Sequence, residues 1–329
     1  MSRTPVLEVN NLSVGYETTK GLLEAVRKVD FSVYENEIVG LIGESGSGKS
    51  TLAYALMRLL KNGAKVTGGS VKVLGQDIYN MDPETLRKFR WSSISMVFQS
   101  AMNALNPVMT VEQQIIDTLR FHNPNISKKA AFEAACELFE LVRIDPSRLK
   151  SYPHELSGGM RQRVVIAIAI ALKPKFVIMD EPTTALDVVV QKSILDQIME
   201  LKEQLGFSIL FISHDFSLVS EIADRVAVMY SGRLVEVADS DTLSTPEGHH
   251  PYTEGLIHAI PRLTDKHTKL RGIPGNPPAL DKIPSGCAFH PRCKYAEAAC
   301  FTEAPPIVKT EHHSIVECHL HAKVGGARV

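Results

Sequence analysis

Hydrophobic and polar positions near the N-terminus follow the periods of strands and then of a helix. The stretch VLEVNNLSVGY at residues 6–16 alternates as a half-buried strand does. Residues 31–43, FSVYENEIVGLIG, predict two strands around a polar turn, and the second strand ends in a glycine-rich loop. In TLAYALMRLL at residues 51–60, apolar residues recur at helical spacing.

The middle of the chain continues this exchange of strands and helices. SISMVFQ at residues 93–99 predicts a buried strand, and about fifty mixed-helical residues follow it. Further on we expect a helix in VVIAIAIAL, a strand in FVIMDE, a helix in VVVQKSILDQIMELKEQL, and strands in SILFIS, VAVMY and RLVEV. Strands that alternate with helices favour an α/β fold with a mostly parallel sheet.

The composition changes near residue 245, where proline and glycine become frequent and the periodic patterns fade. Only a short helix is expected there, near residues 252–259. We therefore predict one large domain over residues 1–245 and a separate extension with little apolar core over residues 246–329.

Charge and hydropathy exclude several classes of protein. The 329 residues are 44% hydrophobic and 22% charged, and their formal net charge is −1, so no basic field indicates nucleic acid. The longest apolar run, residues 164–172, is far shorter than the roughly 20 residues that span a bilayer. The N-terminus lacks the apolar core of a secretory signal. We expect a cytosolic protein without a transmembrane segment, in which clustered cysteines bind metal more often than they form disulfides.

The clearest motif is GESGSGKST, which matches the phosphate loop G-x-x-x-x-G-K-[ST] between a predicted strand and helix. Its glycines let the backbone N–H groups surround phosphates closely. Lys49 would bring a positive charge to the β- and γ-phosphates, and the Ser50 hydroxyl would bind Mg²⁺. The predicted nucleotide-binding residues are Gly43, Ser45, Gly46, Ser47, Gly48, Lys49, Ser50 and Thr51.

Two further motifs follow the phosphate loop. FVIMDE predicts a buried strand that ends at Asp180, a candidate Mg²⁺ ligand, and at Glu181, which could orient or deprotonate the attacking water. In LSGGM, the residues Ser157, Gly158 and Gly159 precede a helix. They could bind an anion through exposed N–H groups, or they could simply cap the helix.

With these three motifs in this order, residues 5–245 resemble the ATP-binding subunits of ABC transporters. The resemblance implies a P-loop NTPase with a RecA-like core, an antiparallel β subdomain and a helical subdomain at about residues 100–170. It implies a head-to-tail dimer in which residues 157–159 of one subunit close on ATP held by the phosphate loop of the other. Hydrolysis would then depend on dimer closure.

The resemblance also assigns roles to single residues. Tyr16 matches the aromatic residue that stacks on adenine, and His214 matches the histidine that contacts the γ-phosphate. Gln99 matches the glutamine that senses the γ-phosphate, Mg²⁺ and water, and Asp187 matches the loop that crosses the dimer interface. The catalytic residues implied are Glu181, His214, Gln99 and Lys49, and the implied Mg²⁺ ligands are Ser50, Gln99 and Asp180.

Residues 99–107, 249–261 and 286–300 resemble the oligopeptide and dipeptide permease branch, although Ser100-Ala101 replaces the usual Asp-Pro. The resemblance implies an ATPase that powers a di- or oligopeptide importer from the cytoplasmic face of the membrane. Its partners would be a second ABC ATPase, expected to be a different paralogue, two membrane permease subunits and an extracytoplasmic solute-binding protein. The cargo could instead be an oligosaccharide, nickel or another solute. A soluble ABC ATPase that acts on nucleic acid or ribosomes is a distant alternative, because the chain has one phosphate loop, no heptad run and no basic stripe.

Four of the five cysteines lie in the extension with the spacing C-x5-C-x6-C-x17-C: Cys287, Cys293, Cys300 and Cys318. Structural zinc sites favour C-x2–4-C pairs, whereas four irregularly spaced thiolates can hold a [4Fe–4S] cluster. The resemblance also favours this cluster, with zinc, unligated thiols or disulfides as alternatives, and it leaves open a structural or a regulatory role. The runner-up ligands are His290, His312, His313 and His319. The fifth cysteine, Cys136, lies at helical spacing and is predicted to be buried in the core.

Overall fold

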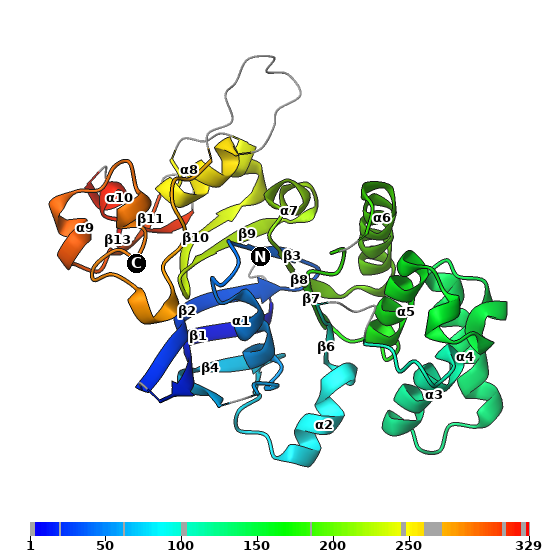
Figure 1. Cartoon of the computed structure of the whole chain (residues 1–329). Coiled ribbons are helices and arrows are strands. Elements are labelled where there is room, and N and C mark those ends of the chain that lie inside the picture. Colours follow the sequence, from blue (N-terminus) through cyan, green and yellow to red (C-terminus); the bar gives the residue numbers. More distant parts are fainter. Residues whose placement is uncertain are drawn as a thin grey trace. The chain divides into compact units, whose positions relative to one another are not determined.

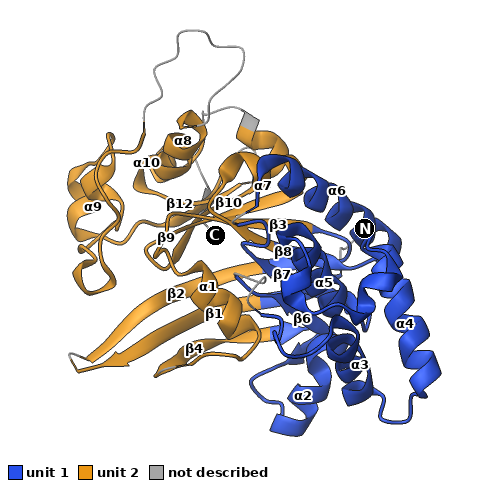
Figure 2. Cartoon of the chain, turned by 45° about the vertical axis from the view of Figure 1, so that its right-hand side comes forward, with its two compact units in different colours: residues 1–8, 32–37, 72–210 blue, residues 9–31, 38–71, 211–329 orange. Residues whose placement is uncertain are grey.

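The computed structural model describes residues 4–19, 21–61, 63–99, 104–184, 186–244, 248–259, 272–310, 314–323 and 327–328. The chain divides into two compact units that are interleaved in sequence (Figure 2). Unit 1 comprises residues 1–8, 32–37 and 72–210, and unit 2 comprises residues 9–31, 38–71 and 211–329. The phosphate loop therefore belongs to unit 2, and the acidic strand end belongs to unit 1. The predicted domain boundary at residue 245 stays a prediction.

The core of unit 2 is a sheet built around β3 (Ile38–Ile42) and β9 (Arg225–Tyr230), which pair in parallel. Every residue of β3 and all but the first residue of β9 are buried, as expected of central strands with both faces covered. β10 (Arg233–Asp239) pairs antiparallel with β9, and α7 (Phe216–Ile222) packs on β3 (Figure 1). The phosphate loop connects β3 to α1 (Lys49–Leu56), as the motif predicts.

A second sheet contains four strands in the order β2-β1-β4-β5. Its members are β1 (Pro5–Thr18), β2 (Gly21–Tyr34), β4 (Ala64–Val73) and β5 (Gln76–Asp77). This is the antiparallel β subdomain that the resemblance implies. β4 was not predicted, because Gly68 and Gly69 interrupt the alternation of apolar and polar residues in AKVTGGSVKV.

Unit 1 contains two parallel strands, β6 (Ile94–Val97) and β7 (Phe176–Asp180), and a group of helices. The helices are α2 (Pro83–Ser92), α3 (Val111–His122), α4 (Lys128–Leu141), α5 (Gly158–Ile170) and α6 (Val188–Leu205). The helices α3, α4 and α5 contact one another, and their apolar faces form the core of this region. One prediction was wrong here: Cys136 lies within α4 but is only half-buried, and the buried face of this helix is formed by Ala131, Ala135, Leu138 and Phe139.

β8 (Ser208–Ser213) spans the division between the units and is entirely buried. No helix in the described ranges is both long and apolar enough to cross a bilayer.

The C-terminal extension adds strands to the sheet of unit 2. β12 (Ile315–Glu317) pairs antiparallel with β10, and β11 (Ile307–Lys309) pairs with β12 and with β13 (Ala327–Arg328). The expected short helix is α8 (Pro251–His258), and two further short helices are α9 (Ala298–Thr302) and α10 (His319–Lys323). One apolar cluster of this part contains Val308, Val316 and Cys318, and Tyr252, Ile257 and Phe289 are buried as well. The small size expected for the apolar core of the extension stays a prediction.

Candidate functional site

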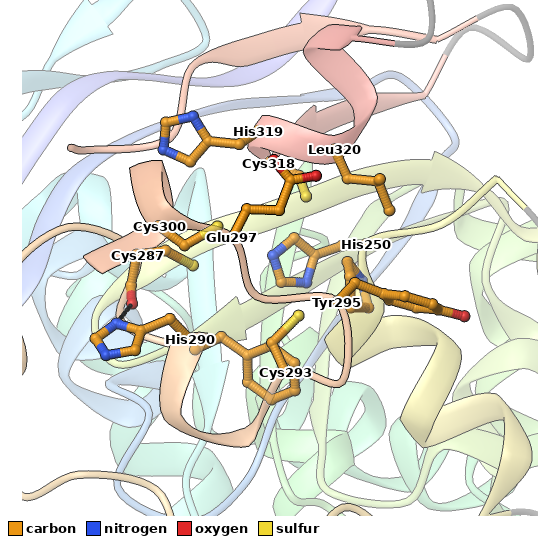
Figure 3. Close-up of a pocket in the computed structure, with 12 residues that line it drawn as sticks. His250, Cys287, His290, Cys293, Tyr295, Glu297, Cys300, Cys318, His319 and Leu320 are labelled. Carbon is orange, nitrogen blue, oxygen red and sulfur yellow. Dashed lines mark hydrogen bonds between the residues drawn. The ribbon is translucent and has the colours of Figure 1, made fainter. Parts of the chain in front are cut away.

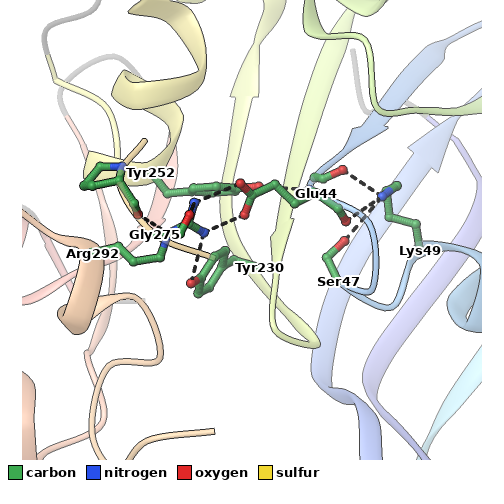
Figure 4. Close-up of polar contacts among 9 residues, drawn as sticks. Glu44, Ser47, Lys49, Tyr230, Tyr252, Gly275 and Arg292 are labelled. Carbon is green, nitrogen blue, oxygen red and sulfur yellow. Dashed lines mark hydrogen bonds and ion pairs between the residues drawn. The ribbon is translucent and has the colours of Figure 1, made fainter. Parts of the chain in front are cut away.

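The phosphate loop holds the side chain of Lys49 inside its own curve. The Lys49 ammonium donates to the carbonyl oxygens of Gly43 at 2.7 Å and Glu44 at 3.0 Å, and contacts the Ser47 hydroxyl at 3.4 Å (Figure 4). Lys49 is only 6% exposed. The loop therefore keeps a positive charge beside the N-terminus of α1, where backbone N–H groups also favour an anion.

Glycine is required at the loop position where α1 begins. Gly48 has a φ of 107°, in the left-handed region that favours glycine. A Cβ atom at this position would lie 2.3 Å from the carbonyl oxygen of Ala25. The tight approach of the neighbouring strand thus adds to the conformational requirement, and both explain the glycine before Lys49.

Tyr16, the predicted adenine-stacking residue, reaches the end of this loop. Its hydroxyl lies 2.9 Å from the hydroxyl of Thr51, the last residue of the motif. The contact connects β1 to the phosphate loop within unit 2. The structure therefore brings Tyr16 beside the predicted nucleotide site, and stacking on adenine stays a prediction.

The acidic strand end in unit 1 brings Glu181 and Gln99 together. The two residues follow β7 and β6, and because these strands are parallel neighbours, their carboxyl ends meet at one edge of the sheet. Gln99 donates from Nε2 to Glu181 Oε2 at 3.1 Å, and the Thr184 hydroxyl donates to the same oxygen at 3.1 Å. Asp180 is completely buried at the last position of β7. Thr184 was missed from the sequence, where a threonine after a strand carries no distinctive signal.

The LSGGM motif forms the start of α5. The Ser157 hydroxyl accepts a hydrogen bond from Met160 N at 3.2 Å and so caps the helix. A Cβ atom on Gly159 would lie 2.8 Å from a methyl group of Val190, so this glycine allows α5 to begin close to α6. Asp187 caps α6 in the same way, by accepting from Val190 N at 2.9 Å. The capping interpretation is confirmed for Ser157, and its contact with ATP stays a prediction.

His214 lies directly after β8 and is exposed. It belongs to unit 2, as the phosphate loop does. Its contact with the γ-phosphate stays a prediction.

The four cysteines of the extension line a single pocket (Figure 3). Cys287 donates its backbone N–H to the carbonyl of Cys300 at 2.9 Å, and His290 Nδ1 lies 2.9 Å from the Cys287 carbonyl. All four are free thiols, so the disulfide alternative is wrong for this structure. His290 and His319 also line the pocket, and His312 and His313 lie outside the described residues.

Burial raises the pKa of three of these thiols, those of Cys287, Cys293 and Cys318. It raises the pKa of Cys287 and of Cys318 to about 11 in each case, and it also raises the pKa of Cys293. The neighbouring cysteines add to the effect, because each thiolate would repel the others. Cys287, Cys293 and Cys318 therefore carry their protons at neutral pH. Within the described ranges, no group of three or more histidine, cysteine, aspartate or glutamate side chains has an arrangement that would hold a metal ion.

Comparison with known proteins adds the family to this geometry. Residues 26–184 match the family model described as ABC transporter, and residues 235–300 match the model described as oligopeptide/dipeptide transporter, C-terminal region. Over 307 residues, the chain is 46% identical to a protein of Brucella abortus (strain 2308) with the provisional name of a peptide import ATP-binding protein, and the match covers 93% of this chain and 92% of the relative.

Two further relatives extend the comparison. The chain is 43% identical over 323 residues to the oligopeptide transport ATP-binding protein AppD of Bacillus subtilis (strain 168). The match covers 97% of this chain and 98% of AppD. Among solved structures, the dimeric post-hydrolysis state of the ATP-binding cassette MJ0796 bound to ADP and Pi is similar with a TM-score of 0.64 and 27% identity, over 71% of this chain and 98% of the cassette. The chain belongs to the ATP-binding proteins of ABC transporters, in their oligopeptide/dipeptide import branch.

Proposed function

We propose that the chain hydrolyses ATP to power the import of di- or oligopeptides through two membrane permease subunits. The chain would bind these subunits at the cytoplasmic face of the membrane. The observation that carries this proposal is the complete phosphate loop with Lys49 held inside it, in a chain that shares 43% of its residues with AppD over nearly its full length. A solute-binding protein outside the membrane would deliver the cargo.

Three residues would bind Mg²⁺ and the phosphates. Lys49 would move its charge from loop carbonyls to the β- and γ-phosphates, and the hydroxyl of Ser50 and the carboxylate of Asp180 would hold Mg²⁺. Hydroxyl and carboxylate oxygens are the hard ligands that Mg²⁺ prefers, so the donor set fits the ion. When bound, Mg²⁺ neutralises charge that develops on the phosphates.

Glu181 would orient and deprotonate the water that attacks the γ-phosphate. Its Oε2 accepts hydrogen bonds from Gln99 and Thr184, which would hold the carboxylate in a fixed orientation toward the water. Gln99 would report the presence of the γ-phosphate to the neighbouring helical region. His214 would donate to the γ-phosphate, and Tyr16 would stack on adenine.

A dimer would complete each site. Ser157, Gly158 and Gly159 of one subunit would close on ATP bound to the phosphate loop of a second ABC ATPase, and Asp187 would lie at their interface. The relative MJ0796 is dimeric in its ADP-bound and Pi-bound state, which supports this arrangement. Hydrolysis would then follow closure, and the permease subunits would use the opening and closing motion.

For the cysteine pocket we propose a [4Fe–4S] cluster held by Cys287, Cys293, Cys300 and Cys318. Support comes from the convergence of all four cysteines on one pocket of the extension. A cluster of several irons would accept the four thiolates without requiring them to surround a single ion. Because the pKa values of Cys287 and Cys318 are raised, binding of the cluster would release protons from these thiols. The bound cluster would also connect segments of the extension that are distant in sequence.

Transport is tested with the chain reconstituted in vesicles with its permease subunits and binding protein. ATP-dependent uptake of a labelled peptide, lost in Lys49→Ala, is the expected result. Uptake of an oligosaccharide or nickel in place of peptide would correct the cargo.

Anaerobic purification tests the cluster. A brown protein with about four irons and matching sulfide per chain is expected. A colourless protein with one zinc would assign the pocket to zinc instead.

A further inference from the structure

A bidentate ion pair connects the C-terminal extension to the phosphate loop (Figure 4). Arg292 NH1 donates to Glu44 Oε2 at 2.6 Å, and NH2 donates to Glu44 Oε1 at 2.9 Å. Glu44 is the second residue of the phosphate loop, and Arg292 directly precedes Cys293 in the pocket. Arg292 is 8% exposed and the Glu44 side chain is 29% exposed, so this pair is partly shielded from water and salt.

The remaining donors of Arg292 fix the orientation of its guanidinium group. Nε donates to the Pro274 carbonyl at 2.8 Å, and NH2 also donates to the Gly275 carbonyl at 3.3 Å. NH1 makes a longer contact of 3.4 Å to the Tyr230 hydroxyl. All three nitrogens therefore have partners, and a planar fork held in this way can direct a carboxylate more narrowly than a lysine can.

Tyr252 in α8 makes a second connection to the same residue. The backbone N–H of Glu44 donates to the Tyr252 hydroxyl at 2.9 Å. Tyr252 is fully buried, and its ring packs against Tyr230 at a centroid distance of 4.7 Å and against Phe289 at 5.4 Å. Burial raises the pKa of Tyr252 well above its usual value, so the hydroxyl stays neutral.

Glu44 also contacts Lys49 directly. Its carbonyl oxygen accepts from Lys49 Nζ at 3.0 Å. The extension therefore binds the carboxylate and the N–H of Glu44, and the carbonyl of the same residue binds the lysine that would meet the phosphates.

We propose that Arg292 and Tyr252 are positioning residues that hold the phosphate loop, through Glu44, in the shape that binds the phosphates of ATP. This proposal rests on the proposed role of Lys49 and deepens it, because nucleotide affinity then depends on the extension. Arg292 also neutralises a carboxylate within the phosphate loop. Without it, the charge on Glu44 would repel the phosphates of the nucleotide.

Arg292 thus positions Glu44 and neutralises its charge. These two contributions predict an order of the Kd for ATP among variants of the full chain. Arg292→Gln removes the connection and leaves the Glu44 charge uncompensated, so the Kd for ATP should rise about 30-fold, within the range of coupling between sites. Glu44→Gln removes the connection and the charge together and should raise Kd only about threefold. The double variant should resemble Glu44→Gln, since the repulsion is gone. Tyr252→Phe removes only the acceptor of the Glu44 N–H and should raise Kd about threefold.

Isothermal titration calorimetry with ATP measures these Kd values, and steady-state ATPase rates give a second readout. A positioning role predicts that KM rises in Arg292→Gln while kcat at saturating ATP stays near the wild-type value. A partial return in Arg292→Lys is expected, because lysine restores the charge but not the bidentate contact. If Arg292→Gln does not fold, the combination of Glu44→Gln and Tyr252→Phe carries the test.

Arg233→Gln is the matched control. Arg233 in β10 pairs with Glu317 of the extension at 2.9 Å, and this pair involves no residue of the phosphate loop. The Kd for ATP should stay unchanged in this variant, and thermal unfolding reports any loss of stability. Equal losses of affinity in Arg233→Gln and Arg292→Gln would overturn the proposal, as would an unchanged Kd in Arg292→Gln. Wild-type ATP affinity in Lys49→Ala would instead reject the proposed role of the phosphate loop, which is a separate outcome.

Discussion

The phosphate loop and the cysteine pocket both belong to unit 2, but they are supported in different ways. The loop follows β3 and lies beside β9, strands of five and six residues that are almost completely buried. Cys318 of the pocket directly follows β12, and β12 and its neighbour β11 have only three residues each. Longer buried strands therefore stabilise the first region, whereas the strands next to the second region are short.

Buried hydrogen bonds and an ion pair also hold the extension in place. His249 Nδ1 lies 2.5 Å from Glu236 Oε1, and the His250 N–H donates to Glu236 Oε2 at 2.8 Å. These groups are buried, so their hydrogen bonds are costly to break. Arg292 makes a similar connection to the phosphate loop. The difference indicates that long buried strands stabilise the ATPase core, whereas specific polar contacts contribute more to the extension.

The largest expected effect concerns ATP hydrolysis, because its proposed base, Glu181, belongs to unit 1 and not to the extension. Glu181→Gln should lower the ATPase rate about 10²–10⁴-fold, as expected for loss of a general base, and should leave ATP binding intact. Phosphate release and nucleotide binding measure the two quantities. Glu200→Gln makes the same charge change at an exposed residue of the same unit, paired with Arg143, and should be neutral. Normal turnover in Glu181→Gln would reject Glu181 as the base.

The next effect tests what the pocket contributes to the extension. Cys318→Ser should lose most of the bound iron and sulfide, and the extension should then become sensitive to protease, because a bound metal stabilises the folded state that holds it. Cys136→Ser, at the edge of α4, should keep both. Metal analysis and limited proteolysis of the full chain check this result. Full iron in Cys318→Ser would remove Cys318 from the ligand set.

One matched pair of core substitutions compares the two regions directly. Val228 in β9 and Val316 in β12 are both fully buried. Val228→Ala should lower the free energy of global unfolding by about 2 kcal/mol. Val316→Ala should leave global unfolding nearly unchanged and increase hydrogen exchange in the extension, because a weakly packed region opens locally. If both variants lowered global stability equally, the two regions would unfold together and the comparison would be wrong.

The sequence predicted the parts of the molecule that follow from periodicity or from a motif. β3, β6 and β7, the phosphate loop and α5 were all expected, since continuous apolar runs and fixed spacings specify them. β11 and β12 were missed, because three residues are too few to show a period. The contact of Arg292 with Glu44 was also missed, because it joins residues far apart in sequence and Glu44 occupies a variable position of the motif. Thr184 was missed for a different reason: its hydrogen bond to Glu181 depends on the turn after β7, which no motif in the sequence specifies.

The smallest expected effect concerns Tyr16. This residue contacts Thr51 at the last position of the phosphate loop, whereas the extension contacts Glu44 near the start of the loop. Tyr16→Ala should weaken ATP binding by about 1 kcal/mol, roughly fivefold, because an aromatic stack contributes about this much. Tyr16→Phe keeps the ring and removes only the hydroxyl contact with Thr51, so it should bind ATP nearly as the wild type does. Titration with ATP and with a triphosphate that lacks a base separates the two roles, since stacking affects only the first ligand. Equal weakening in both variants would show that Tyr16 acts through Thr51, and the two ends of the loop would then both be positioned by tyrosine hydroxyls.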